Sequence, residues 1–150
     1  MNVKDLLRSS PGNYNTALLI IRVVVGLTFF MHGIQKFFLS EGGVSGFGGW
    51  LGSMGVPLPA VAGVIVALLE VFGGLALILG IGTRIVGWLL AVNMLVALLL
   101  VHVSNGFFAQ NGGYELVLLL GVSSAALAMS GSGALSLDAQ IAEDAELAPS

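Results

Sequence analysis

Long, nearly uninterrupted apolar segments constrain the fold of this chain more than any other feature of its sequence. They cover residues 16–38, 59–80, 84–103 and 114–130. An α-helix needs about 20 predominantly apolar residues to cross a hydrocarbon core roughly 30 Å thick, and each segment comes close to that length. The sequence therefore predicts four membrane-spanning helices, of which the last is the shortest.

The composition agrees with a membrane location. Hydrophobic residues make up 57% of the 150 residues and charged residues only 9%, whereas a soluble domain carries about 25% charge. This number of charged residues is too small to cover the outside of a water-soluble domain. Membrane lipid is therefore the expected environment. No basic cluster indicates a nucleic-acid partner. The lack of cysteine excludes disulfides, thiolate nucleophiles and iron–sulfur clusters held by this chain.

Basic residues predict the orientation of the spans. Lys4 and Arg8 precede the first span, and Arg84 lies in the short turn between the second and third. Four spans place all three on one side, which the positive-inside rule makes cytoplasmic, although Lys36 lies at the other end. The first apolar run is too long for the core of a cleaved signal peptide, so we expect it to be retained. We therefore expect a multi-pass membrane protein with both termini in the cytoplasm.

The expected organisation is a cytoplasmic segment (1–15), a four-helix domain (16–130) and an acidic, largely disordered cytoplasmic tail (131–150). In the first outer loop, apolar residues recur at the i, i+3, i+4 and i+7 spacing of one helix face, namely Phe47, Trp50, Leu51 and Met54. With a tryptophan among them, they predict a short helix in the membrane interface. The predicted fold class is all-α, an integral membrane four-helix bundle with a short interfacial helix.

Ionisable residues inside the predicted spans are the candidates for a functional site. Each costs about 2.5–3.5 kcal/mol if it faces lipid. We therefore expect these side chains to point into the bundle and to meet partners there. They are Arg22, His32, Lys36, Glu70, His102 and Glu115.

Helical phase and depth divide these candidates into two groups. On the first helix, Lys36 and His32 lie within about 40° and 80° of Arg22 at 100° per residue, so the three share a face. Arg22 is expected within reach of Glu70, which predicts a buried ion pair near the middle of the membrane. The second group is an outer cluster of His32, Lys36, His102 and Glu115.

Each candidate also has a purely structural interpretation. A buried Arg22–Glu70 pair can fix helix register without any chemistry, and Lys36 can extend its ammonium group to the interface. Glu115 stands near the start of the fourth helix, where the positive end of the helix dipole favours a carboxylate. His102 stands at a helix end, where an interfacial histidine needs no function.

The histidines raise the question of a haem or a metal. His32 and His102 stand at similar depth, but two histidines alone are no haem signature. A metal site that adds Glu115 needs a convergence that the sequence does not show. We predict no metal, no haem and no covalently held cofactor. Asn93 lies about 180° from His102 on the third helix, so we do not expect both in one site.

The same residues carry a resemblance to a known family. Over about residues 17–138 the chain resembles the DoxX-like family of small four-helix bacterial membrane proteins. The most specific match is the glutamate–diglycine run followed by a Thr-Arg pair: Glu70, Gly73, Gly74, Thr83 and Arg84. The other matching residues are Arg22, Gly26, His32, Gly33, Lys36, His102, Gly112, Gly113, Tyr114, Glu115, Leu135, Ser136, Leu137 and Asp138. Ser132 departs from the family, whose members commonly have proline there.

The resemblance implies a location in the bacterial inner membrane and a redox role. The family takes its name from a membrane subunit of a terminal quinol oxidase, and its relatives include subunits of thiosulfate:quinone oxidoreductases. We therefore expect a quinone- or quinol-interacting component of a membrane oxidoreductase complex. Its catalytic residues, which donate hydrogen bonds and relay protons, would be His32, Glu70, His102 and Glu115. Its substrate-binding residues would be Arg22 and Lys36.

Other functions stay open at this point. Because the chain has no cysteine and no cofactor motif, a redox role needs electrons from a partner redox subunit, and a homo-oligomer stays open as well. The first alternative is a non-enzymatic membrane scaffold or assembly partner, in which the polar groups only hold the helices together. The second is a small-solute or proton pathway that uses the same intramembrane groups. Whether the chain is itself an enzyme is left open.

Overall fold

The computed structural model describes residues 11–147, and all regular structure within them is helical. The predictions for Lys4 and Arg8 lie outside the described residues. The main helices are α2 (Pro11–Ile34), α3 (Gly43–Ser53), α4 (Pro59–Leu79), α5 (Thr83–Ala97), α6 (Glu115–Ser130) and α7 (Leu137–Leu147). Two π-helical turns, η1 (Gln35–Leu39) and η2 (Leu98–His102), continue α2 and α5. Two short 3₁₀ turns follow, η3 (Val103–Asn105) and η4 (Ala109–Asn111).

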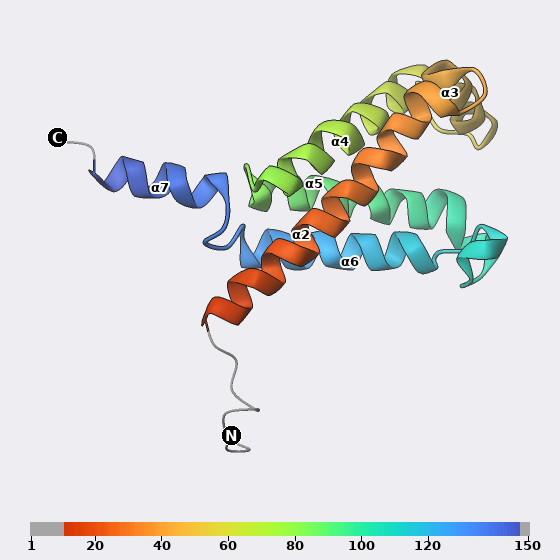
Figure 1. The fold of residues 1–150 in the computed structure, drawn as a ribbon. Helices are drawn as coiled ribbons and strands as arrows, with labels where there is room; N and C mark the ends of the chain where they lie inside the picture. Colours follow the sequence, from red (N-terminus) through yellow and green to blue (C-terminus); the bar gives the residue numbers. More distant parts are fainter. Residues whose placement is uncertain (1–10, 148–150) are drawn as a thin grey trace.

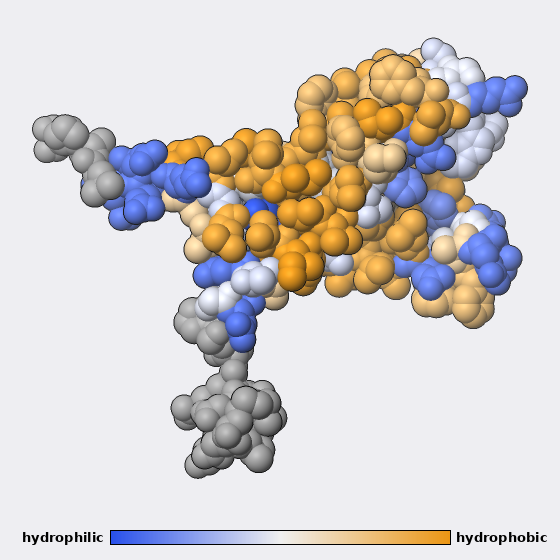
Figure 2. Space-filling view, viewed as in Figure 1, coloured by the Kyte–Doolittle hydropathy of each residue, from blue (hydrophilic) through white to orange (hydrophobic). Residues whose placement is uncertain are grey.

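Three continuous helical segments are long and apolar enough to cross a membrane: Gly12–Leu39, Pro59–Leu79 and Thr83–Asn105. The fourth apolar helix, α6, stands where the fourth span was predicted but has only 16 residues. Figure 2 shows hydrophobic side chains over the middle of the molecule and hydrophilic ones gathered towards its two ends. An apolar outer surface of this extent requires lipid around it, so the chain is a membrane protein.

The long helices pack as two pairs, α2 against α4 and α5 against α6, and α4 also contacts α5 (Figure 1). Glycines bring the helices of each pair together. A Cβ on Gly26 would lie 2.6 Å from the carbonyl oxygen of Gly74, and a Cβ on Gly87 would lie 2.8 Å from that of Ser124. Small residues permit this backbone contact, which lets helices associate where lipid removes the hydrophobic driving force.

Helix α3 stands at the place where the first outer loop was predicted to be helical. It lies against α4, and its Gly48 meets the backbone around Ala60. Leu51 is buried, while the rings of Phe47 and Trp50 stack with centroids 5.8 Å apart. We call the end of the bundle that carries α3 the α3 end.

A fully buried apolar layer separates the α3 end from the opposite end. Phe29, Leu77, Leu90 and Leu127 contribute side chains that are at most 1% exposed. They come from all four long helices, so the centre of the bundle is closely packed.

The tail differs from the prediction of a largely disordered segment. Residues 131–136 fold back against the end of the bundle opposite α3, and α7 follows them. The residues of α7 are mostly strong helix formers such as alanine, glutamate, glutamine and leucine. This helix propensity outweighs the acidic charge from which disorder was predicted.

Hydrogen bonds hold the tail in place. The guanidinium group of Arg22 donates to the carbonyl oxygens of Ser132 and, at 2.7 Å, Leu135. The carboxylate of Asp138 accepts hydrogen bonds from the backbone N–H of Gly82 at 2.8 Å and of Thr83 at 3.1 Å. These are free N–H groups at the start of α5, where a carboxylate also meets the positive end of the helix dipole.

Candidate functional site

A cavity of about 350 Å³ opens at the α3 end, between the α2–α3–α4 layer and the α5–α6 layer. Its walls are mainly apolar and aromatic, and only a few polar side chains reach it. The polar ones are His32, Lys36, Glu70, Asn93 and His102. An apolar hollow with a few converging polar groups is the usual form of a small-molecule site.

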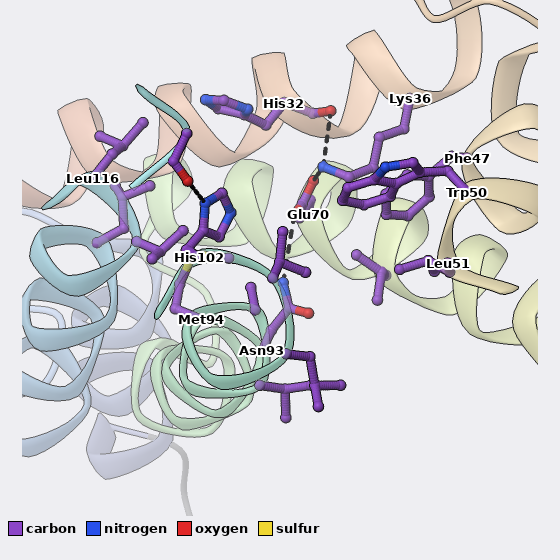
Figure 3. Close-up of a pocket in the computed structure, with 18 of the residues that line it drawn as sticks. His32, Lys36, Phe47, Trp50, Leu51, Glu70, Asn93, Met94, His102 and Leu116 are labelled. Carbon is purple, nitrogen blue, oxygen red and sulfur yellow. Dashed lines mark hydrogen bonds and ion pairs between the residues drawn. The ribbon is translucent and has the colours of Figure 1, made fainter. Parts of the chain in front are cut away.

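The central polar feature of the cavity is an ion pair between α4 and η1. The Lys36 Nζ lies 2.5 Å from the Glu70 Oε2, and the amide of Asn93 donates to the other carboxylate oxygen at 3.4 Å. Figure 3 shows Glu70 between these two side chains. The Glu70 side chain is 4% exposed and that of Lys36 is 17% exposed. One ammonium thus neutralises one carboxylate, and the cluster carries no net charge.

Lys36 has further contacts that fix its direction. Its Nζ is 3.5 Å from the carbonyl oxygen of His32 and 5.2 Å from the centre of the Phe47 ring. A cation over an aromatic face is stabilised by the ring quadrupole. The short helix α3 therefore helps to hold the ammonium group at the cavity.

The predicted Arg22–Glu70 pair is wrong. Gly26 meets Gly74 and Gly33 meets Val71 in the antiparallel α2–α4 contact, which places Glu70 about level with residue 31 of α2. Lys36 is then about 8 Å further along the axis and Arg22 about 13 Å in the other direction, at 1.5 Å per residue. Helical side chains lean towards the N-terminus, so Lys36 leans towards Glu70 while Arg22 leans away from it.

His102 is held in a defined orientation by the loop before α6. Its Nδ1 lies 2.6 Å from the carbonyl oxygen of Gly112, which also accepts from the Asn105 amide at 3.2 Å. A carbonyl oxygen can only accept, so Nδ1 carries the proton and a neutral ring keeps Nε2 as an acceptor. The imidazole can therefore take up a proton at Nε2.

Asn93 and His102 line the same cavity, contrary to the prediction from an ideal helix. The reason is the π-helical turn η2, which follows Asn93 and ends at His102. A π turn contains one residue more than an α turn, so it turns the following side chains back by about 100°. The angle between the two residues falls from about 180° to about 80°, and both reach the cavity.

The other predicted site residues divide between the cavity and positions away from it. His32 lines the cavity, and within residues 11–147 its ring makes no hydrogen bond. Glu115 is outside the cavity lining, exposed, and accepts from the Ala109 N–H at 3.0 Å. Arg22 binds the tail at the opposite end. Over the described range, no group of three or more His, Asp or Glu side chains is placed as metal ligands would be.

Sequence reasoning missed the contribution of α3 to the site. Phe47, Trp50 and Leu51 line the cavity, although their spacing was interpreted only as an interfacial face. The sequence prediction also left Asn93 out of the polar residues of the site. An amide in the middle of an apolar run was the available signal, because such a group needs a buried partner.

Comparisons with known proteins find one family model and two similar proteins. The family model described as DoxX matches residues 17–103. A Bacillus subtilis (strain 168) protein named "Putative oxidoreductase CatD" is 34% identical over 126 residues, which cover 84% of this chain and 87% of the relative. An uncharacterised Haemophilus influenzae protein is 40% identical over 124 residues, covering 81% of this chain and 87% of the relative. No solved structure matches.

Proposed function

Because the chain belongs to the DoxX family of membrane proteins, we propose that it binds a quinone or quinol as a component of a membrane oxidoreductase complex. The observation that carries the proposal is the polar cluster of Lys36, Glu70 and Asn93, which has no net charge and lies inside an apolar cavity. The name of the Bacillus subtilis relative, "Putative oxidoreductase CatD", supports the same class of activity.

The chemistry of a quinone matches this lining. Its ring is flat and apolar and its two oxygens accept hydrogen bonds, while a quinol presents hydroxyl protons in their place. The Lys36 ammonium and the Asn93 amide are donors for a carbonyl oxygen, and the Nε2 of His102 is an acceptor for a hydroxyl proton. Since the ammonium is already neutralised by Glu70, the cavity favours a neutral ligand over an anion. His32 supplies a second imidazole for proton transfer.

The electrons in this proposal come from a partner redox subunit. The chain has no cysteine and no cofactor motif, and in redox enzymes the electron transfer itself is done by a cofactor. The chain then contributes the quinone site and the groups that handle protons, and no covalently held cofactor is required of it. A homo-oligomer would leave this arrangement unchanged.

The proposed placement in the membrane has four spans, formed by α2, α4, α5 with η2, and α6. With 16 residues, α6 is about 24 Å long, so it needs a locally thinner bilayer. The aromatic pair Phe47–Trp50 supports an interfacial position for α3 in this proposal, because aromatic rings are enriched at membrane interfaces. Arg84 and the charged α7 lie at the opposite end, which becomes the cytoplasmic side of a bacterial inner membrane with both termini inside.

Binding of a quinone analogue to the purified protein tests the proposal. Trp50 lines the cavity whereas Trp88 is exposed and outside it, so Trp88→Phe leaves one tryptophan that reports on the site. We expect a quinone to quench this fluorescence saturably. Lys36→Met combined with Glu70→Gln removes both charges and is expected to weaken binding at least tenfold while the protein stays folded. Glu115→Gln is the matched control and is expected to bind like the parent protein.

A scaffold that binds no quinone is the main competing function, since a Lys36–Glu70 pair also fixes helix register. In that case the doubly substituted protein would keep both its fold and its cellular activity, and no quinone would quench Trp50. A proton pathway has less support, because the fully buried side chains of Phe29 and Leu77 close the space between Glu70 and the opposite end.

A further inference from the structure

The cavity is not enclosed on all sides by the bundle. Trp50 of α3, Val96 of α5 and Leu100 of η2 line it and are still 48%, 48% and 57% exposed. Figure 1 shows the α2–α3–α4 layer and the α5–α6 layer diverging towards the α3 end. Large apolar side chains that are both part of a cavity wall and exposed in a membrane protein meet acyl chains. The opening between the two layers is therefore lined for contact with lipid.

The opposite direction is closed. Below Glu70 the helices are sealed by Phe29, Leu77 and Leu90, which are at most 1% exposed. The direct backbone contact between Gly26 and Gly74 closes the space between α2 and α4 at the same level. A ligand of the cavity can therefore leave or extend only at the α3 end.

The size of the cavity limits what it can hold. Its volume of about 350 Å³ is near the lower end of the roughly 300–1,000 Å³ of small-molecule sites. A single ring with its polar substituents fits that volume, but a ring that carries a long hydrocarbon tail exceeds it. Such a tail has to pass out of the cavity, and the exposed apolar side chains of Trp50, Val96 and Leu100 provide a path that needs no polar group to be desolvated.

We propose that the ligand is a lipid-soluble quinone with a long apolar tail, taken up sideways from the leaflet at the α3 end. The ring lies beside the Lys36–Glu70–Asn93 cluster, and the tail passes between α3 and the α5–η2 segment into the lipid. This inference rests on the proposed quinone function and adds the substrate class and its route. A water-soluble substrate, by contrast, would not require an apolar opening in the cavity wall.

Two neighbouring leucines provide a matched test. Leu99 and Leu100 are both 57% exposed, but only Leu100 lines the cavity. Leu100→Trp narrows the opening and Leu99→Trp adds the same bulk on the outside. Binding of two tritiated probes to the full chain in nanodiscs is compared by scintillation proximity: 2,3-dimethoxy-5-methyl-1,4-benzoquinone, which has no tail, and its 6-decyl derivative. Each variant is compared with wild type in the same lipid, so partitioning of the probe cancels.

We expect Leu100→Trp to lower the affinity for the decyl probe at least tenfold and that for the tailless probe less than twofold. Leu99→Trp should change neither affinity. Circular dichroism checks the fold, and Val96→Trp on the same opening replaces Leu100→Trp if that variant does not fold.

Four outcomes overturn the inference. If both probes bind wild type and the decyl probe binds Leu100→Trp with unchanged affinity, the sideways route is wrong although the quinone function stands. Equal losses for the two probes, or a loss in Leu99→Trp, would show that the tail does not use this opening. If neither probe binds wild type, the proposed quinone function itself fails, and the route fails with it.

Discussion

The Lys36–Glu70 pair predicts an asymmetric response to removal of its partners. Lys36→Met leaves the Glu70 carboxylate, which is 4% exposed, without its counter-ion deep in the bundle. Loss of one partner of a buried pair costs about 3–5 kcal/mol. Glu70→Gln leaves Lys36, which is 17% exposed and has a long, flexible side chain that can turn its ammonium towards the interface.

We therefore expect Lys36→Met to lower the free energy of unfolding by about 3 kcal/mol. The corresponding loss for Glu70→Gln is about 1 kcal/mol, since an ammonium that reaches water loses little. The double variant removes both charges and keeps the volume, so it should lie within about 1 kcal/mol of wild type. The coupling energy of the double-mutant cycle is then at least about 3 kcal/mol.

Unfolding by sodium dodecyl sulfate in mixed micelles, followed by far-UV circular dichroism, measures these four free energies. Glu115→Gln is the matched control, because Glu115 is exposed and its Ala109 hydrogen bond can be kept by the glutamine oxygen. The reasoning is refuted if Lys36→Met costs no more than this control and the coupling energy is below about 0.5 kcal/mol. A larger loss for Glu70→Gln than for Lys36→Met would contradict the argument from lysine flexibility.

Three further substitutions test the contacts that organise the bundle and its tail. Arg22→Met should lower the free energy of unfolding by about 2 kcal/mol, because it leaves two tail carbonyls without this donor. Limited proteolysis should then remove α7 faster than in wild type, and an unchanged rate of cleavage would argue against the contact. Asp138→Ala removes the carboxylate at the start of α5 and should cost about 1 kcal/mol in the same detergent titration, whereas exposed Asp144→Asn should cost nothing measurable. Gly26→Ala places a methyl group 2.6 Å from a backbone oxygen of α4 and should cost about 2 kcal/mol, while Gly12→Ala, with nothing within 4 Å, should leave the melting temperature unchanged or slightly raised.

The long apolar elements were predictable because hydrophobicity alone determines them. The predicted second span, 59–80, agrees with α4 (Pro59–Leu79), and the predicted fourth, 114–130, agrees with α6 (Glu115–Ser130). Proline at the first helical position and glycine just after the last explain the accuracy of the α4 bounds. The family was also identified correctly from motif residues.

The partners of the buried charges were less predictable. Arg22 binds carbonyl groups of Ser132 and Leu135, more than a hundred residues away in the sequence. No local sequence pattern predicts such a contact. The partner of Glu70 followed from the offset between α2 and α4 and from the lean of helical side chains. The tilt of helical side chains towards the N-terminus is a general property of the helix. The axial offset between α2 and α4, in contrast, depends on the Gly26–Gly74 contact, which the sequence does not show.

The shared position of Asn93 and His102 depends on a departure from the ideal helix. A period of 3.6 residues places them on opposite sides, and the π-helical turn η2 brings them together. Lys36 lies in the corresponding turn η1. Such turns are frequent at functional sites but have no simple sequence signature. The helical phase of Asn93 and His102 was therefore predicted wrongly at the residues that line the cavity.

Photoaffinity labelling tests the central claim, that a quinone binds in the cavity beside the Lys36–Glu70 pair, most directly. The probe is an azido-benzoquinone with a decyl tail, added to the protein in nanodiscs and located by mass spectrometry. We predict label on α3 and on residues 93–102, displaced by unlabelled decylquinone and lost in the Lys36→Met, Glu70→Gln double variant. Label spread over lipid-facing positions such as Leu119 and Val122, unaffected by competitor and by the double substitution, would contradict the account.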